Sequence, residues 1–170
     1  MIDTVKRLGT DLKGASNGFV QMQMSAYGSG LTLQPVNETW EAFSGALLVT
    51  NADALRTEGT FRALTQMMSK GRVQAEELRG QLSEHLPGGF QLAARAMNMT
   101  TQELEKMVSE GQLVVSELFP AISRQLREEF GPAMALAMET PRAQLNRLRT
   151  EMQTFVYDLL PTFNAVFGTI

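Results

Sequence analysis

Few side chains in this sequence are of types that carry out chemistry, and their spacing does not combine them into a site. The 170 residues include one histidine, His85, and no cysteine. Thiol nucleophiles, thiolate zinc sites, iron–sulfur clusters and multi-histidine metal sites are therefore excluded. No serine or carboxylate is spaced to orient His85 as a general base, so the sequence favours a surface or capping role for it.

The carboxylates do not form a catalytic pair either. They stand side by side or one residue apart, at Glu76/Glu77, Glu103/Glu105 and Glu128/Glu129. Neighbouring side chains on a helix point about 100° apart, so they cannot share a proton or a metal ion. We interpret these carboxylates as parts of solvated helix faces. The sequence thus predicts a protein that is not an enzyme and has no cofactor.

Charge and hydropathy also restrict the partners. Arg142, Arg147 and Arg149 are flanked by acidic residues, and we interpret them as a solvated face, with contact to an anionic partner as the alternative. The net charge is −3 and the pI is near 5.2, which argues against a specific nucleic acid partner. The apolar runs at 46–49 and 133–138 are far shorter than the roughly 20 residues of a stable membrane span.

Helices must position whatever surface carries the function. Apolar residues make up 44% of the chain and charged residues 19%, a globular composition. Apolar positions recur with helical period almost throughout, and we interpret the one strand-like segment, 31–35, as an extended linker. The sequence predicts an all-α fold, a compact domain of seven to eight helices.

Glycine residues predict where the earlier helices end. Gly14 is expected to stop a first helix at 3–13, and Gly71 to follow a helix at 52–69. A further helix is expected to start near Gln74 and to run to Leu86.

Capping residues and prolines divide the second half of the chain. Thr100 and Glu103 have the spacing of a capping box at the start of a short helix. Gly131-Pro132 predicts a break after a helix at 115–130, and Thr140-Pro141 predicts a new start. The last helix then carries one apolar stripe: Leu145, Leu148, Met152, Phe155 and Leu159.

Two segments of the chain match each other at an offset of 40 residues. Residues 68–78 align with 108–118, and the matches extend outward on both sides. Each copy has a short helix, a glycine, one apolar residue and a Glu-Leu helix start. The glycine permits positive φ at the turn, and Val73 and Leu113 are expected to fill the corners. We interpret this pattern as a pseudo-repeat of about 40 residues.

Methionine is abundant, with 11 residues, and seven of these recur on apolar helix faces: Met67, Met68, Met97, Met99, Met107, Met134 and Met138. Core packing is the favoured interpretation. An adaptable apolar groove, as in a stand-alone helical protein-binding module, is the alternative. For the apolar end at 155–167, packing in a core or an oligomer is favoured over a membrane surface.

The central segment resembles a known family. Residues 65–97 contain Glu-Glu-Leu-Arg-Gly-Gln-Leu followed by Leu-Pro-Gly, and they are similar to the tape-measure domain of bacteriophage tail tape measure proteins. The positions that carry the resemblance, which we call the motif residues, are Gly71, Glu76, Glu77, Leu78, Arg79, Gly80, Gln81, Leu82, Leu86, Pro87, Gly88, Gly111, Leu118 and Pro120.

The resemblance implies a structural protein of a phage or prophage tail. Family members determine tail length, take part in tail assembly and leave with the DNA at infection. Their partners would be tail assembly chaperones and the tail tube and tail-tip proteins, with self-association left open. They would occupy the host cytoplasm during assembly and then the tail lumen. The alternative becomes a binding module derived from a prophage.

The resemblance also implies a division of the chain. A helical segment at 1–26, belonging to a longer chain, would precede the tape-measure domain at 27–165 and a tail at 166–170. As one helix, 170 residues would span at most about 255 Å, and the glycine and proline breaks favour a compact domain instead. We therefore expect a fragment of a longer tape measure protein or a shortened prophage remnant.

Overall fold

A computed structural model describes the backbone of residues 1–10, 12–29 and 32–167 and the side chains of residues 1–10, 13–29 and 32–156. The described residues contain helices and no strand, which confirms the all-α class. There are nine α-helices and one π-helix in this part of the chain, against the seven to eight expected: α1 (Ile2–Leu8), α2 (Leu12–Gly28), α3 (Leu33–Val49), α4 (Ala54–Lys70), the π-helix η1 (Glu76–Leu82), α5 (Ser83–His85), α6 (Gly89–Ala96), α7 (Thr101–Ser109), α8 (Val115–Met138) and α9 (Pro141–Phe167).

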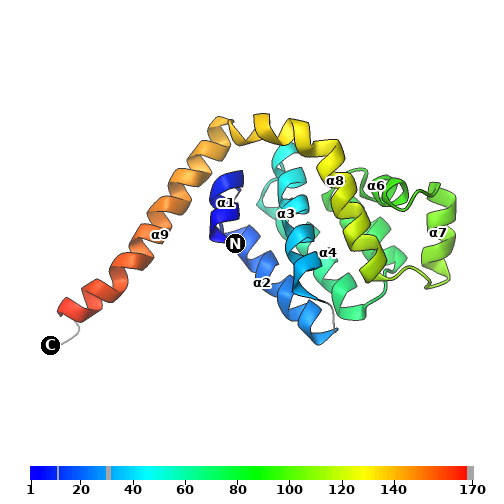
Figure 1. Ribbon diagram of the computed structural model, residues 1–170, viewed down its shortest axis with the longest axis horizontal. Helices are drawn as coiled ribbons and strands as arrows, with labels where there is room; N and C mark the ends of the chain where they lie inside the picture. Colours follow the sequence, from blue (N-terminus) through cyan, green and yellow to red (C-terminus); the bar gives the residue numbers. More distant parts are fainter. Residues whose placement is uncertain (11, 30–31, 168–170) are drawn as a thin grey trace.

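The helices build a compact body from which the last helix projects. Helix α3 packs along α8, while α2 packs against both α4 and α3. On the other side, η1 lies on α4 and α6 lies on α8, with α7 against α6. Helix α1 contacts α2, α3 and α9, and α9 extends away from the body beyond α1 (Figure 1). One core joins the helices of the body, and Trp40, Phe43 and Phe61 are its largest fully buried side chains.

A glycine lets α2 and α4 approach closely. Gly18 lies in the middle of α2, and a Cβ there would lie 2.5 Å from Cγ of the buried Phe61. Beside it, the rings of Phe19 and Trp40 meet edge to face with centroids 5.0 Å apart, and Nε1 of Trp40 donates to the carbonyl of Ala15 at 2.9 Å. These contacts fasten α2 to α3 and α4.

Helices α3 and α8 are joined by a polar contact within the apolar core. The buried Ser123 hydroxyl donates to the Thr39 hydroxyl oxygen, with 3.0 Å between the two oxygens. Thr39 in turn donates to the carbonyl of Pro35 at 2.7 Å. Because both hydroxyls have partners, this contact avoids the cost of an unpaired buried polar group.

The two glycine corners of the sequence meet in space. Gly71 and Gly111 have φ of 68° and 66°, and both Val73 and Leu113 are fully buried. The Val73 N–H donates to the Leu113 carbonyl at 2.9 Å, and the Val115 N–H donates to the Gly71 carbonyl at 3.2 Å. These bonds flank an antiparallel bridge between residues 72 and 114. The structure therefore joins the two corners that align in the sequence. The longer pseudo-repeat stays a prediction, because a π-helix follows one corner and an α-helix follows the other.

Three predictions of local structure were wrong. The segment 31–35 is not an extended linker throughout, because α3 already begins at Leu33 and Pro35 lies in its first turn. The first helix ends at Leu8, because Gly9 takes the left-handed conformation with φ of 69°, while Gly14 lies inside α2. Helix α8 does not break at Gly131-Pro132 but continues to Met138. Figure 1 shows that it changes direction instead, in its yellow part, as expected where proline removes a backbone donor.

Two of the three arginines of α9 bind the body and so depart from the solvated face that we predicted, while Arg149 is exposed. Arg142 donates to the carbonyl of Ala52 at 2.9 Å and also to Asn51. Arg147 donates to the carbonyls of Lys6 and Arg7 at 3.0 Å each, at the end of α1. Arg149 lines a surface cavity of about 930 Å³ beside them. Free carbonyls at a helix C-terminus attract cations, as at the end of α1, and the loop after α3 supplies the carbonyls for Arg142, so two of the arginines fasten α9 to the body.

The close packing of α2 on α4 predicts an effect of adding one methyl group. We expect Gly18→Ala to lower the free energy of unfolding relative to Gly28→Ala, by roughly 1–3 kcal/mol, because the new Cβ would press on Phe61. Gly28 ends the same helix with open space around its Cβ position, so it shows the effect of the added methyl group without a packing clash. Urea unfolding of both variants measures the difference, and equal stabilities would contradict the packing.

The ion pair between α6 and α8 predicts part of the acid sensitivity. Arg95 donates two hydrogen bonds to Glu129, at 2.7 and 2.8 Å, and these hold the pKa of Glu129 below its ordinary value. This stabilisation is present above the ordinary carboxyl pKa and is lost as pH falls through the lowered pKa.

Glu129→Gln should therefore lose less stability than the wild type between about pH 6 and about pH 3, measured by urea unfolding. Glu128→Gln is the matched control, because it leaves the Arg95–Glu129 pair intact. A wild-type pH response in Glu129→Gln would show that this pair adds nothing to acid sensitivity.

Candidate functional site

The motif residues 76–82 form the π-helix η1, directly after the corner at Gly71. A π-helix bonds each N–H to the carbonyl five residues earlier, is rare, and occurs frequently at functional sites. Leu78 and Leu82 are fully buried against the body, as is Leu86 just beyond, while Arg79 and Gly80 are exposed. The segment thus presents a short polar surface on an apolar base.

Glu77 is buried, which corrects the prediction of a solvated face. Its side chain is only 1% exposed and forms an ion pair with the half-exposed Lys70 at the end of α4. Lys70 also donates to Gln74 at 2.7 Å, and the second carboxylate oxygen of Glu77 has no hydrogen-bond partner. Of the two neighbouring carboxylates Glu76 and Glu77, only Glu76 is exposed.

The π-helix explains why Glu77 lies inside. With α-helical period Glu77 falls one residue off the stripe of Leu78 and Leu82. In η1 the ladder joins residues five apart, so Glu77 turns onto the same face as Leu82. The sequence offered one signal for this arrangement, the acidic and basic pair at Lys70 and Glu77 on either side of a glycine corner.

Arg79 connects η1 to two other helices. It donates to Glu105 of α7 at 2.8 Å, and its guanidinium carbon lies 5.9 Å from the ring centre of Phe90 in α6. A surface cavity of about 500 Å³ opens beside these side chains. Ser83 lines it and is engaged at both ends, donating to the Leu78 carbonyl at 3.0 Å and accepting from the Phe90 N–H at 3.1 Å. The cavity therefore has polar walls with no free nucleophile among these groups.

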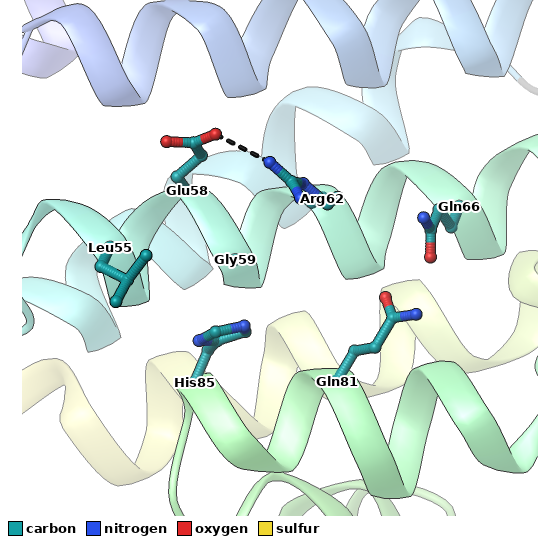
Figure 2. A pocket seen from close by; sticks show the side chains of 7 residues that line it. All are labelled: Leu55, Glu58, Gly59, Arg62, Gln66, Gln81 and His85. Atoms are coloured by element: carbon teal, nitrogen blue, oxygen red, sulfur yellow. Dashed lines mark hydrogen bonds and ion pairs between the residues drawn. The ribbon is translucent and has the colours of Figure 1, made fainter.

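A smaller cavity of about 310 Å³ lies between α4 and the η1–α5 segment. In Figure 2 the side chains of His85 and Gln81 point from the lower helix toward α4. Seven residues line the cavity: Leu55, Glu58, Gly59, Arg62, Gln66, Gln81 and His85.

The smaller cavity holds groups that pair among themselves. The imidazole of His85 packs against Gly59, where a Cβ would collide with it. Glu58 and Arg62 form an ion pair at 2.9 Å, drawn as the dashed line in Figure 2. The His85 carbonyl accepts a hydrogen bond from Nε of Arg56 at 3.0 Å. His85 thus helps to dock α5 on α4. The surface or capping role that the sequence favoured stays a prediction.

The other motif residues lie at turns or on α8. Gly88 has φ of 82° beside the exposed Pro87, and the short α6 follows at once. Leu118 is buried in α8, where it joins the core, whereas Pro120 is exposed two residues further along the same helix. The structure joins the two glycine corners, with η1 following one of them, and leaves Pro120 exposed on α8. Their role as family-specific positions stays a prediction.

The methionine groove, which we kept as the alternative to core packing, has no counterpart among the described cavities. Met67 and Met68 are buried in the core, and the other five are half-buried. Met134, for example, packs against Gly45 of α3. None of the seven lines the three cavities described above. Among the described residues, no three metal-binding side chains gather into a group, and no helix there is long and apolar enough to cross a membrane.

Comparison with known proteins decides the family. A family model described as "Tape measure protein" matches residues 1–159. The chain belongs to the tape measure protein family. Within 71 residues, it is also 45% identical to the "Probable tape measure protein" of Salmonella phage Felix O1 (isolate Felix O1-VT1). That match covers 42% of this chain and 10% of the relative, so the matched segment is a small part of a much longer protein. No solved structure matches significantly.

The buried ion pair of this family member predicts an asymmetry between two pairs on α4. We expect Lys70→Met to lower the free energy of unfolding by roughly 1–3 kcal/mol, because it leaves the Glu77 carboxylate buried without its cation. Arg62→Met, which breaks the exposed pair with Glu58, should cost well under about 1 kcal/mol. Urea unfolding at neutral pH measures both, and equal costs would contradict a structural role for Glu77.

Proposed function

We propose that this chain is a structural segment of a phage or prophage tail tape measure protein. Its roles would be in tail length determination and tail assembly, and further in DNA ejection. The observation that carries the proposal is the family match over residues 1–159. Two ion pairs support it, since Glu77 pairs with Lys70 of α4 and Arg79 with Glu105 of α7, which are contacts that hold helices together.

The shape of the segment suits a folded part of a long protein better than a ruler on its own. A helix rises about 1.5 Å per residue, so α9, the longest helix with 27 residues, spans only about 40 Å. The relative that matches is about ten times longer than the matched segment. Any length measurement would therefore depend on the whole protein, with this segment as one folded unit within it.

The partners follow from the family and belong to the same proposal. They would be tail assembly chaperones in the host cytoplasm, and then the tail tube and tail-tip proteins in the virion. The exposed surface around η1, with Glu76 and Arg79, offers polar groups for such contacts. The division at residues 26 and 165 remains part of the proposal, and residues 168–170 of the predicted tail lie outside the described part of the chain.

Particle association tests the proposed function. Antibodies against the 170-residue chain would probe induced source cells and the particles purified from them. We expect the antigen to enrich with tailed particles, in a band at or above 18.8 kDa. In-frame removal of the coding segment should give particles with absent or abnormal tails in electron micrographs.

Two results would count against the proposal. One is an antigen that stays in the cytosol while intact tailed particles form without it. The other is normal tail length and infectivity after in-frame removal of the segment. Restoring the segment in trans is the control, because it separates loss of this protein from effects on neighbouring genes.

A further inference from the structure

Helix α9 is attached to the body by polar contacts along one face. Ala143 and Thr150 are buried on this face, and Nδ2 of Asn146 donates to the Gly9 carbonyl at 3.0 Å. The approach is close, since a Cβ on Gly9 would lie 2.6 Å from the carbonyl oxygen of Ala143. Among the described residues, every hydrogen bond from α9 to the body beyond Arg142 goes to a carbonyl of residues 6, 7 or 9. The position of α9 therefore depends on the end of α1.

The apolar stripe that the sequence predicts for α9 takes no part in this attachment. Its described side chains are between 55% and 66% exposed: Leu145, Leu148, Met152 and Phe155. The side chain of Leu159 lies outside the described residues. Figure 1 shows α9 extending away from the body beyond α1. Packing of an apolar face is what usually holds a helix in place, so here the polar face must do so.

Helix α1 connects α9 to the rest of the body. Its side chains Val5 and Leu8 are fully buried, and Arg7 forms an ion pair with Glu41 of α3. Its last carbonyls receive the bonds from α9, since Nε and Nη2 of Arg147 each lie 3.0 Å from a carbonyl oxygen, those of residues 6 and 7. Carbonyls at a helix C-terminus have no partner within the helix and carry partial negative charge, so a guanidinium group is a favourable partner. Helix α1 thus binds the body with its side chains and α9 with its backbone.

The joint between α8 and α9 leaves the direction of α9 open. Helix α8 ends at Met138 and α9 begins at Pro141, which cannot donate a backbone hydrogen bond across the joint. Figure 1 shows the two helices diverging from this point. Arg142 donates to the carbonyl of Ala52 at 2.9 Å, but it lies one residue after Pro141 and so holds the pivot rather than the far part of the helix. The contacts farther along α9, at positions 146 and 147, therefore set its direction.

We propose that α1 is a latch for α9: its C-terminal carbonyls fix the direction in which α9 leaves the body, and α9 swings about residues 139–140 when these bonds are broken. Asn146 and Arg147 are the residues of α9 that close the latch. Because Arg7 binds α3 with its side chain and α9 with its carbonyl, a displacement of α1 is transmitted to α9. The latch thus couples two segments that lie 140 positions apart in the chain. The inference rests on these contacts and holds whether or not the chain acts in a tail.

Pulsed electron paramagnetic resonance between two spin labels tests the latch. The chain has no cysteine of its own, so labels are attached at Gln153→Cys in α9 and at either Ser116→Cys in α8 or Gln21→Cys in α2, all exposed positions. We expect one narrow distance for each label pair while the latch is closed. The combined change Asn146→Ala and Arg147→Ala should broaden or shift these distances. A swing of about 20° moves residue 153, about 18 Å along the helix from the joint, by roughly 6 Å.

Two further variants make the test specific. Arg149→Ala is the matched control, because it removes an exposed arginine of the same helix that has no hydrogen bond to the body among the described residues, and the distances should stay as in the wild type. Val5→Asp opens the latch from the other side, because it removes the buried anchor of α1 and leaves α9 unchanged, and it should give the same swing. Fluorescence of Trp40, the single tryptophan, reports whether the body stays folded.

Three results would overturn the latch. The first is a folded Asn146→Ala, Arg147→Ala variant whose distances match those of the wild type. The second is a wild-type distribution that is already as broad as that of this variant, which would mean that α1 does not hold α9. The third is an equal effect of Arg149→Ala. If Val5→Asp unfolds the body, the combined variant decides alone, because its two side chains lie outside the core.

Discussion

The contact between the two glycine corners is the constraint on which the rest of the body depends. Each corner has a left-handed glycine followed, two residues later, by a fully buried side chain, Val73 or Leu113. The corners satisfy each other's backbone groups through the Val73–Leu113 and Val115–Gly71 hydrogen bonds. Buried backbone groups must be paired, so neither corner can move away without leaving the other unsatisfied. This contact holds the α4–η1 hairpin against the α7–α8 hairpin.

The π-helix and its ion pair follow from that contact. Helix α4 ends at Lys70, directly before the corner at Gly71, and η1 begins at Glu76, so Lys70 lies beside the buried Glu77. Arg79 then reaches Glu105 of α7 from the exposed side of η1. The residues that most resemble the tape measure family thus lie where two halves of the body meet, and their described contacts are those of a scaffold.

Local signals in the sequence predicted the helices. The features that the sequence did not predict depend on tertiary contacts. The capping box of Thr100 and Glu103 is present, and α9 begins at Pro141 as expected, because caps and prolines act through neighbouring residues. The burial of Glu77 depends on a π-helical ladder that no α-helical period reveals. The contacts of Arg147 with α1 join residues 140 positions apart in the chain, and sequence spacing carries no information about them. Gly131-Pro132 has the pattern of a break, but the helix bends there and continues.

Amide hydrogen exchange at Val73 and Val115 measures the corner contact most directly. Both amides lie at helix ends or in a loop, where exchange is normally fast unless tertiary structure protects them. If the corners hold the body together, these two amides should exchange as slowly as that of Phe43 in the middle of α3, through global unfolding. Exchange at the rate of a frayed helix end, while Phe43 stays protected, would show that the body holds together without the corner contact.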